Sequence, residues 1–163
     1  MARKIFTSFH YIPDNWRASQ IRSMGKIEGN STVSSNKWEE VTNGGEKAIK
    51  KWIDDNMFGK SCVVVFVGEK TAGRKWIDYE IKKAWEDGKG LVGIHVHKLK
   101  DSNQKQANKG ANPFSRFTVG GKSLSSIVKC YDPGYSTSNY TYNHIKENIE
   151  KWIEEAIEIR SKY

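Results

Sequence analysis

The chain has 163 residues and a formal net charge of +8. This length fits a single domain spanning residues 1–163 with one hydrophobic core. The longest uninterrupted apolar run, Cys62 to Val67, is too short for a signal peptide or a membrane span. We therefore expect a cytoplasmic protein that does not enter a membrane.

The two cysteines, Cys62 and Cys130, each lie in an apolar run typical of a strand. Buried, reduced thiols are usual in that setting. Their number and spacing predict neither a disulfide framework nor a zinc site.

In its first half, the chain alternates short apolar runs with stretches of helical spacing. Residues 4–9 predict a strand, and Asp14 is expected to cap a helix over residues 15–26. A short strand is expected at residues 31–34, and the amphipathic helix that follows ends at Gly59.

The second half continues the alternation with the most apolar segment of the chain. Its continuous Val-rich sequence is typical of a parallel strand that is covered on both faces. In chain order we expect a strand at residues 62–67, a helix at 73–87, strands at 91–96 and 126–131, and a helix from Asn139.

Residues 98–122 are long, polar and irregular for a compact domain, which predicts a mobile loop with few anchoring side chains. Basic residues are concentrated from Lys98 to Lys129, where Asp101 is the one acid. The segment is either a solvated loop kept soluble by its charge or a site for a phosphate-bearing ligand. Its aromatic residues are limited to Phe114 and Phe117, so we do not expect nucleic acid as a partner.

The order of elements predicts an α/β fold, a flavodoxin-like three-layer sandwich. We expect a parallel five-stranded sheet of order 2-1-3-4-5 with helices on both faces. The first and third strands then flank the switch point, where open sheets bind ligands. The loops at residues 10–14 and 68–75 should line that cleft.

Several nucleotide-binding signatures are absent from these loops. Gly68 and Gly73 have P-loop spacing, but Arg74-Lys75-Trp76 follows instead of Gly-Lys-Ser/Thr. The first strand is not followed by Gly-x-Gly-x-x-Gly, so a dehydrogenase-type dinucleotide site is not expected. His95 and His97 alternate along a strand, but without a third ligand at suitable spacing they predict no metal site.

Trp76 and Glu80 lie four residues apart and therefore share one helix face. In one interpretation Glu80 is a solvated residue that pairs with Lys83. In the other, Glu80 is a fixed anion at the cleft, kept ionised by the nearby helix N-terminus. Such an anion could stabilise the oxocarbenium-like centre of glycosidic cleavage.

The chain resembles the TIR-like (Toll/interleukin-1 receptor) domains, in particular the NAD-consuming bacterial branch of Thoeris anti-phage defence. The resemblance covers about residues 3–97 and rests on the following motifs: Ile5-Phe-Thr-Ser-Phe-His-Tyr11, Asp14-x-x-Arg17, Val63-Val-Val-Phe-Val-Gly68 with Thr71, Arg74-Lys-Trp-Ile-Asp-Tyr-Glu-Ile81 and Gly90-Leu-Val-Gly-Ile-His95.

The resemblance implies cleavage of the nicotinamide–ribose bond of NAD. Glu80 matches the catalytic glutamate of the family, and Trp76 matches its paired tryptophan. The residues that match the nucleotide pocket are Ser8, Phe9, His10 and Arg17.

The function implied is that of an NAD nucleosidase or cyclase, with NAD as substrate and no prosthetic group. Its ADP-ribose-type product would signal to a separate defence effector, and the family also implies self-association. The alternative is a non-enzymatic TIR-like adaptor or scaffold that acts through domain contacts. An adaptor has no chemical need for Trp76 or Glu80.

Overall fold

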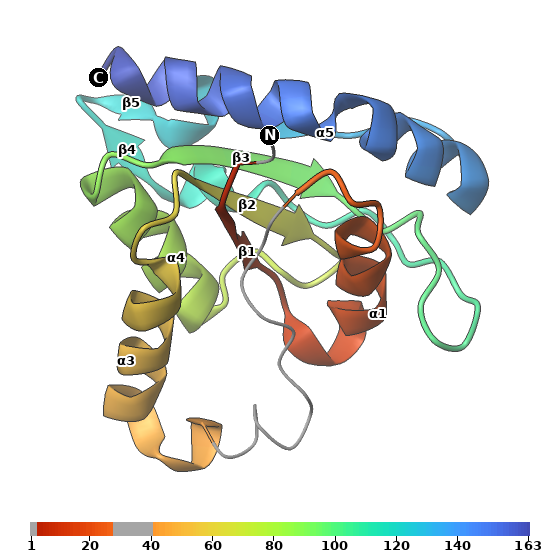
Figure 1. Ribbon diagram of the computed structural model, residues 1–163, viewed down its shortest axis with the longest axis horizontal. Helices are drawn as coiled ribbons and strands as arrows, with labels where there is room; N and C mark the ends of the chain where they lie inside the picture. Colours follow the sequence, from red (N-terminus) through yellow and green to blue (C-terminus); the bar gives the residue numbers. More distant parts are fainter. Residues whose placement is uncertain (1–2, 28–40) are drawn as a thin grey trace.

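The computed structural model describes residues 3–27 and 41–163. Its main sheet contains four parallel strands in the order β1-β2-β3-β6 (Figure 1). The strands are β1 (Ile5–Ser8), β2 (Cys62–Val67), β3 (Gly90–His95) and β6 (Cys130–Tyr131). Every residue of β1, β2 and β3 is buried, which explains their continuous apolar sequences.

Helices cover both faces of this sheet (Figure 1). Side chains of α1 (Tyr11–Arg22) and α5 (Ser138–Ser161) share one core cluster with Val64 and Phe66. Side chains of α3 (Gly45–Met57) and α4 (Lys75–Glu86) share the other cluster with Val63 and Val65. Alternate residues of β2 thus point to opposite faces of the sheet and pack in different core clusters, as the period of two in a strand requires. No helix in the described ranges combines the length and apolarity needed to cross a bilayer.

The α/β class, the parallel sheet and the helices on both faces are confirmed. The four observed strands keep the relative order expected of the first, third, fourth and fifth strands. The strand expected at residues 31–34 lies outside the described residues, so the five-stranded sheet of order 2-1-3-4-5 is not confirmed. The last strand is also shorter than expected: Ser126 ends a 3-10 helix, and only Cys130 and Tyr131 pair with β3.

The first helix starts earlier than its sequence suggested. It begins at Tyr11, and its N-cap residue is His10, whose side chain makes no capping hydrogen bond. Pro13 is tolerated within the first turn because N–H groups there have no partner inside the helix. The prediction that Asp14 caps a helix beginning at Asn15 is therefore wrong.

The segment from residue 98 to residue 122 is better anchored than expected. Leu99 and Phe114 are fully buried, and the N–H of Ala107 donates to the carbonyl of His97 at 2.8 Å. The segment contains the 3-10 helix η1 (Pro113–Arg116), and β4 (Thr118–Val119) pairs with β5 (Lys122–Ser123). The expectation of few anchors is wrong because isolated apolar residues in a polar stretch produce no periodic signal.

Arg17 makes the strongest of these anchors, and it does so from inside the protein. The side chain is 3% exposed, and its guanidinium lies 2.8 Å from the Asp14 carboxylate. The same guanidinium donates to the carbonyls of Leu99 at 2.8 Å and Lys105 at 3.0 Å. Burial raises the pKa of Asp14 despite the adjacent Arg17. Removing the two charges of this pair from water therefore costs free energy.

The two cysteines are unpaired, as predicted. Cys62 lies opposite Gly90 on one side of β3, and Cys130 lies opposite Gly93 on the other side. Because β3 separates them, the cysteines are two strand spacings apart, beyond the reach of a disulfide.

We predict that Arg17→Met lowers the free energy of unfolding by about 3 to 5 kcal/mol, because it leaves the buried Asp14 carboxylate unpaired. The double variant Asp14→Asn/Arg17→Met should lose less, since no charge is then stranded. Lys51→Met is the control, because it breaks an exposed pair with Asp55 and should cost at most about 1 kcal/mol. Chemical denaturation measures all three. Equal losses in Arg17→Met and Lys51→Met would contradict the prediction.

Candidate active site

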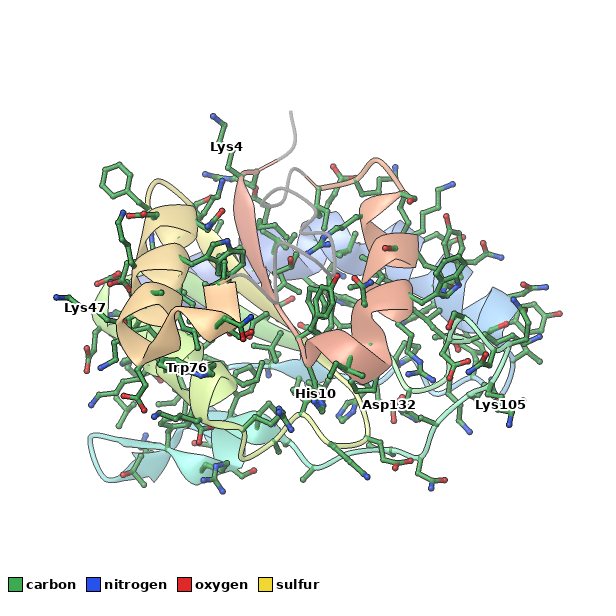
Figure 2. All side chains as sticks on the ribbon, turned by 90° about the horizontal axis from the view of Figure 1, so that it is seen from below. Lys4, His10, Lys47, Trp76, Lys105 and Asp132 are labelled. Carbon is green, nitrogen blue, oxygen red and sulfur yellow. The ribbon has the colours of Figure 1, made fainter. Side chains whose placement is uncertain are left out.

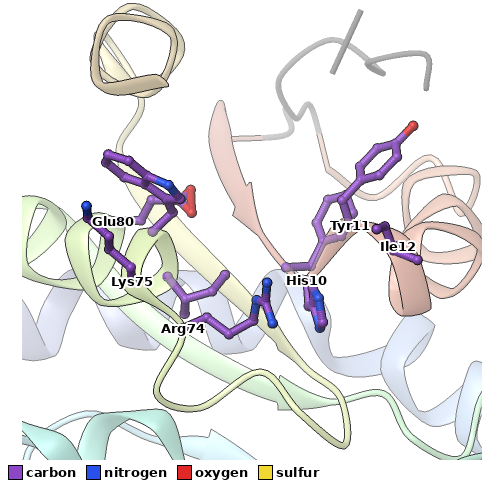
Figure 3. A pocket seen from close by; sticks show the side chains of 9 residues that line it. His10, Tyr11, Ile12, Arg74, Lys75 and Glu80 are labelled. Carbon is purple, nitrogen blue, oxygen red and sulfur yellow. The ribbon is translucent and has the colours of Figure 1, made fainter. Parts of the chain in front are cut away.

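A cavity of about 190 Å³ opens at the carboxyl ends of β1 and β2 (Figure 3). One wall comes from the end of β1 and the first turn of α1, and the other comes from the start of α4. The lining residues are Phe9, His10, Tyr11, Ile12, Arg74, Lys75, Trp76, Ile77 and Glu80. The cavity therefore lies at the edge of the sheet where the strand order predicted a cleft.

Glu80 is buried in this cavity, with 6% of its surface exposed. The hydroxyl of Ser8, at the end of β1, donates to Glu80 Oε1 at 3.3 Å. Lys83 does not pair with Glu80, because its ammonium lies 3.2 Å from Asp87 and 3.8 Å from Asp54. The interpretation of Glu80 as a solvated surface residue is therefore wrong.

Burial raises the pKa of Glu80 well above its ordinary value, and the Ser8 hydroxyl only partly offsets this effect. The expectation that the helix N-terminus keeps the carboxylate ionised does not hold. Glu80 lies in the second turn of α4, whereas the helix dipole acts mainly on the first turn. A carboxyl group so desolvated gains its charge most easily when a cationic ligand comes close to it.

Trp76 forms the wall of the cavity one helical turn before Glu80. Its indole meets the Tyr79 ring edge to face at 5.7 Å, and the Lys75 ammonium lies 5.1 Å from the indole centroid. These contacts leave the half-buried indole fixed beside the open volume. A flat, immobile aromatic face of this kind can stack against a planar ligand.

His10 and Phe9 close the opposite side. Phe9 stacks on Tyr11 with ring centroids 6.1 Å apart. Nδ1 of His10 is buried without a hydrogen-bond partner. Burial lowers the pKa of His10, and the positive charges of Arg74 and Lys70 lower it further. At neutral pH His10 therefore presents a neutral imidazole to the cavity.

Five of the predicted site residues come together around this cavity, namely Ser8, Phe9, His10, Trp76 and Glu80. Figure 2 shows Trp76 and His10 on the face of the molecule that is seen from below, with Lys105 farther away on the same face. Arg17 is placed elsewhere. It lines a neighbouring cavity of about 310 Å³ together with Glu69 and Lys105.

The two loops expected to line the cleft, residues 10–14 and 68–75, supply Tyr11, Ile12, Arg74 and Lys75, although none of these four was predicted as a site residue. Tyr11 and Ile12 were assigned to a turn, and the early start of α1 brings them to the cavity. Arg74 and Lys75 were noted as a departure from the P-loop pattern and as part of the TIR-like motif, but neither was given a role of its own. Their position at the start of the helix that carries Trp76 was the signal available.

His95 and His97 lie outside this cavity and are both 4% exposed, with ring centroids 5.7 Å apart. Burial lowers the pKa of His95 to about 4 and also lowers that of His97. The part of the chain that the structure describes contains no group of three or more His, Cys, Asp or Glu side chains able to hold a metal ion.

Residues 6–101 match the family model described as Thoeris protein ThsB, TIR-like domain. This chain belongs to that family. The match runs from β1 past β3 and includes every residue that lines the Glu80 cavity. The TIR-like resemblance seen in the sequence is thereby confirmed.

A curated relative from Bacillus cereus (strain MSX-D12) is 30% identical over 133 residues, which is 76% of this chain and 69% of the relative. Its name reads "Putative cyclic ADP-D-ribose synthase ThsB1".

We predict that Glu80→Gln raises the melting temperature at pH 8, and that the gain shrinks as the pH falls. Because the folded-state pKa of Glu80 is raised, the native protein binds more protons than the unfolded chain between the two pKa values. The free energy of unfolding of the parent therefore falls as the pH rises through that window. The Glu80→Gln variant escapes this loss, because glutamine does not titrate.

The control is Glu86→Gln, which makes the same change at an exposed position of the same helix. Thermal melts of the parent and both variants from pH 4 to pH 9 measure the effect. A gap between Glu80→Gln and the parent that is constant with pH would contradict this account of Glu80.

Proposed function

We propose that this protein cleaves the nicotinamide–ribose bond of NAD, with NAD bound as its substrate and no prosthetic group required. The observation that carries this proposal is the buried Glu80 carboxyl group, held by Ser8 in a cavity with an aromatic wall. The nicotinamide ring of NAD is positively charged, which complements a desolvated carboxylate.

In the cleavage step, the bonding electrons leave with nicotinamide, which departs as a neutral molecule. The anomeric carbon of the ribose then becomes oxocarbenium-like, and ionised Glu80 stabilises its positive charge. Ser8 holds one carboxylate oxygen in place, and Trp76 stacks against a planar ring. The apolar side chains of Phe9 and Ile77 reduce the access of water to the reacting centre.

Two acceptors can complete the reaction. Attack by water gives linear ADP-ribose, and attack by a ring nitrogen of the substrate's own adenine gives a cyclic product. The printed name of the Bacillus cereus relative favours the cyclic product. The cavity is smaller than the roughly 300 to 1,000 Å³ typical of sites for drug-sized ligands. The nicotinamide riboside end therefore enters the cavity, while the adenosine end remains near its mouth and available for cyclisation.

In this proposal, the product is a diffusible signal that acts on a separate defence effector in the cytoplasm. The coupling then needs no stable complex between the two proteins. Family membership supports this part, since ThsB belongs to Thoeris defence.

A second candidate is a scaffold that acts through domain contacts, including self-association. The observation that favours it is the exposure of Ile12 (87%) and Trp16 (52%), one turn apart on α1. Such a scaffold gains nothing from Glu80, because burying a carboxyl group costs stability. We therefore propose catalysis as the main function. Assembly through α1 is compatible with it.

We predict that Glu80→Gln lowers the rate of nicotinamide release by two to three decades, since removing one electrostatic contact at a transition state costs about 3 to 4 kcal/mol. Parent activity should fall as the pH drops through the raised pKa of Glu80, because only the ionised form stabilises the cation. Chromatography of NAD incubations at increasing protein concentration measures nicotinamide. Glu86→Gln is the matched control. Equal rates in Glu80→Gln and the parent would remove the catalytic role.

We predict that Trp76→Ala shifts the product ratio from cyclic towards linear ADP-ribose, because an unstacked adenine returns to the anomeric carbon less often. A lost base stack corresponds to about 1 to 3 kcal/mol. Trp85→Ala is the control, as it truncates a half-buried tryptophan of the same helix that does not line the cavity. An unchanged ratio in a folded Trp76→Ala variant would assign Trp76 to packing alone.

A further inference from the structure

We propose that Arg74 forms an anion subsite at the mouth of the Glu80 cavity, and that this subsite binds the diphosphate of the nucleotide. The inference rests on the proposed function for the identity of the ligand. It adds a residue that the sequence analysis did not predict as a site residue. It assigns to this residue the binding of the diphosphate, a part of the substrate that does not react.

Arg74 and Glu80 line the same cavity at different depths. Arg74 is the N-cap residue of α4 and is exposed, whereas Glu80 is buried in the second turn. The two residues are separated by about 9 Å along the helix axis, at 1.5 Å per residue. A ribose with its 5′-phosphate bridges a distance of this order. A sugar held at Glu80 therefore places its diphosphate near Arg74.

The direction of the Arg74 side chain fits this role. Figure 3 shows it extending from α4 towards His10, across the opening between the two walls. Arg74 and Lys70 both act electrostatically on the His10 imidazole, so both charges lie within reach of the same opening. By contrast, the Lys75 side chain stays with Trp76 and pairs with Glu46 of α3.

The charge of Arg74 is not neutralised by a carboxylate of residues 3–27 or 41–163. Two neighbouring basic residues are paired, Lys75 with Glu46 and Arg116 with Asp78, the latter at 3.3 Å, whereas Lys70 has no carboxylate partner within the described residues. Arg74 thus keeps a guanidinium fork that is free to bind a ligand. This fork matches phosphate oxygens in a bidentate manner, which an ammonium cannot do.

The surroundings of Arg74 add to its preference for an anion. The N-terminal residues of α4 line the same cavity, and a helix N-terminus favours negative charge. His10 supplies an unpartnered ring nitrogen without adding a second positive charge. The mouth of the cavity is thus cationic, while its floor holds the carboxyl group of Glu80. A nucleotide with a cationic nicotinamide and an anionic diphosphate has the matching polarity.

Titration calorimetry with ADP-ribose, adenosine and inorganic pyrophosphate tests this subsite without requiring turnover. We expect the parent to bind ADP-ribose more tightly than adenosine. Arg74→Gln should weaken ADP-ribose binding about ten- to a hundredfold, as expected for lost charge-assisted hydrogen bonds, while adenosine binding changes less than twofold. Arg74→Lys should recover only part of the loss. Pyrophosphate shows whether the subsite recognises the diphosphate alone or only as part of the nucleotide.

The matched control is Lys82→Gln, which removes the same charge from an exposed position of α4 outside the cavity. It should bind ADP-ribose as the parent does. Circular dichroism checks the fold, which exposed Arg74 does not support. The proposal is overturned if the parent fails to bind ADP-ribose at millimolar concentration, or if Arg74→Gln binds ADP-ribose like the parent or weakens adenosine equally.

The test separates this inference from the proposed function. If ADP-ribose binding depends on Arg74 but the protein does not cleave NAD, the proposed subsite is supported and the proposed enzymatic function is contradicted. If the protein cleaves NAD and Arg74→Gln leaves its affinity for ADP-ribose unchanged, the proposed enzyme is supported and the proposed subsite is contradicted. In an active enzyme, Arg74→Gln should raise the KM for NAD and leave the KM for phosphate-free nicotinamide riboside unchanged.

Discussion

The buried ion pair of Asp14 and Arg17 holds together the edge of the sheet on which the site is built. It joins the first turns of α1 to the backbone of the segment after β3, through the carbonyls of Leu99 and Lys105. The loop after β2 packs against the same pair, because a side chain at Gly68 would collide with the Asp14 carboxylate. Three separate segments are thus fixed at one point, and the start of α1 gains a rigid position beside α4.

This anchoring matters because the residues that line the cavity come from more than one secondary-structure element. Its walls include the starts of α1 and α4, whose buried side chains pack in different core clusters on opposite faces of the sheet. A shift of α1 would move His10, its N-cap residue, away from Arg74. Preorganisation of this kind reduces the reorganisation needed when charge develops in a reaction. The desolvation cost of the Asp14–Arg17 pair is therefore consistent with a functional role for the rigidity it provides.

The sequence predicted best what depends on local periodicity and strand order. Continuous Val-rich β2 and the apolar stripe of α4 were recognised because burial imposes those patterns. The cleft followed from parallel topology alone. The sequence predicted worst what depends on tertiary contacts. Asp14 resembled a cap because its buried partnership with Arg17 is a product of the fold. Leu99 and Phe114 are buried in the core clusters, but they gave no periodic signal because each is an isolated apolar residue in a polar stretch of the sequence.

The same distinction explains why the protonation of Glu80 could not be predicted from sequence. Helix position suggested an ionised carboxylate, whereas burial of Glu80 beside the end of β1 removes the solvent that would stabilise the charge. Because α4 runs from the open mouth to the enclosed floor, its successive turns experience different environments. Arg74 is exposed to water, while Glu80 is desolvated and gains its charge most readily next to a cation. One helix can therefore bind an anion at one end and stabilise a cation at the other, as required to hold a dinucleotide across the bond that breaks.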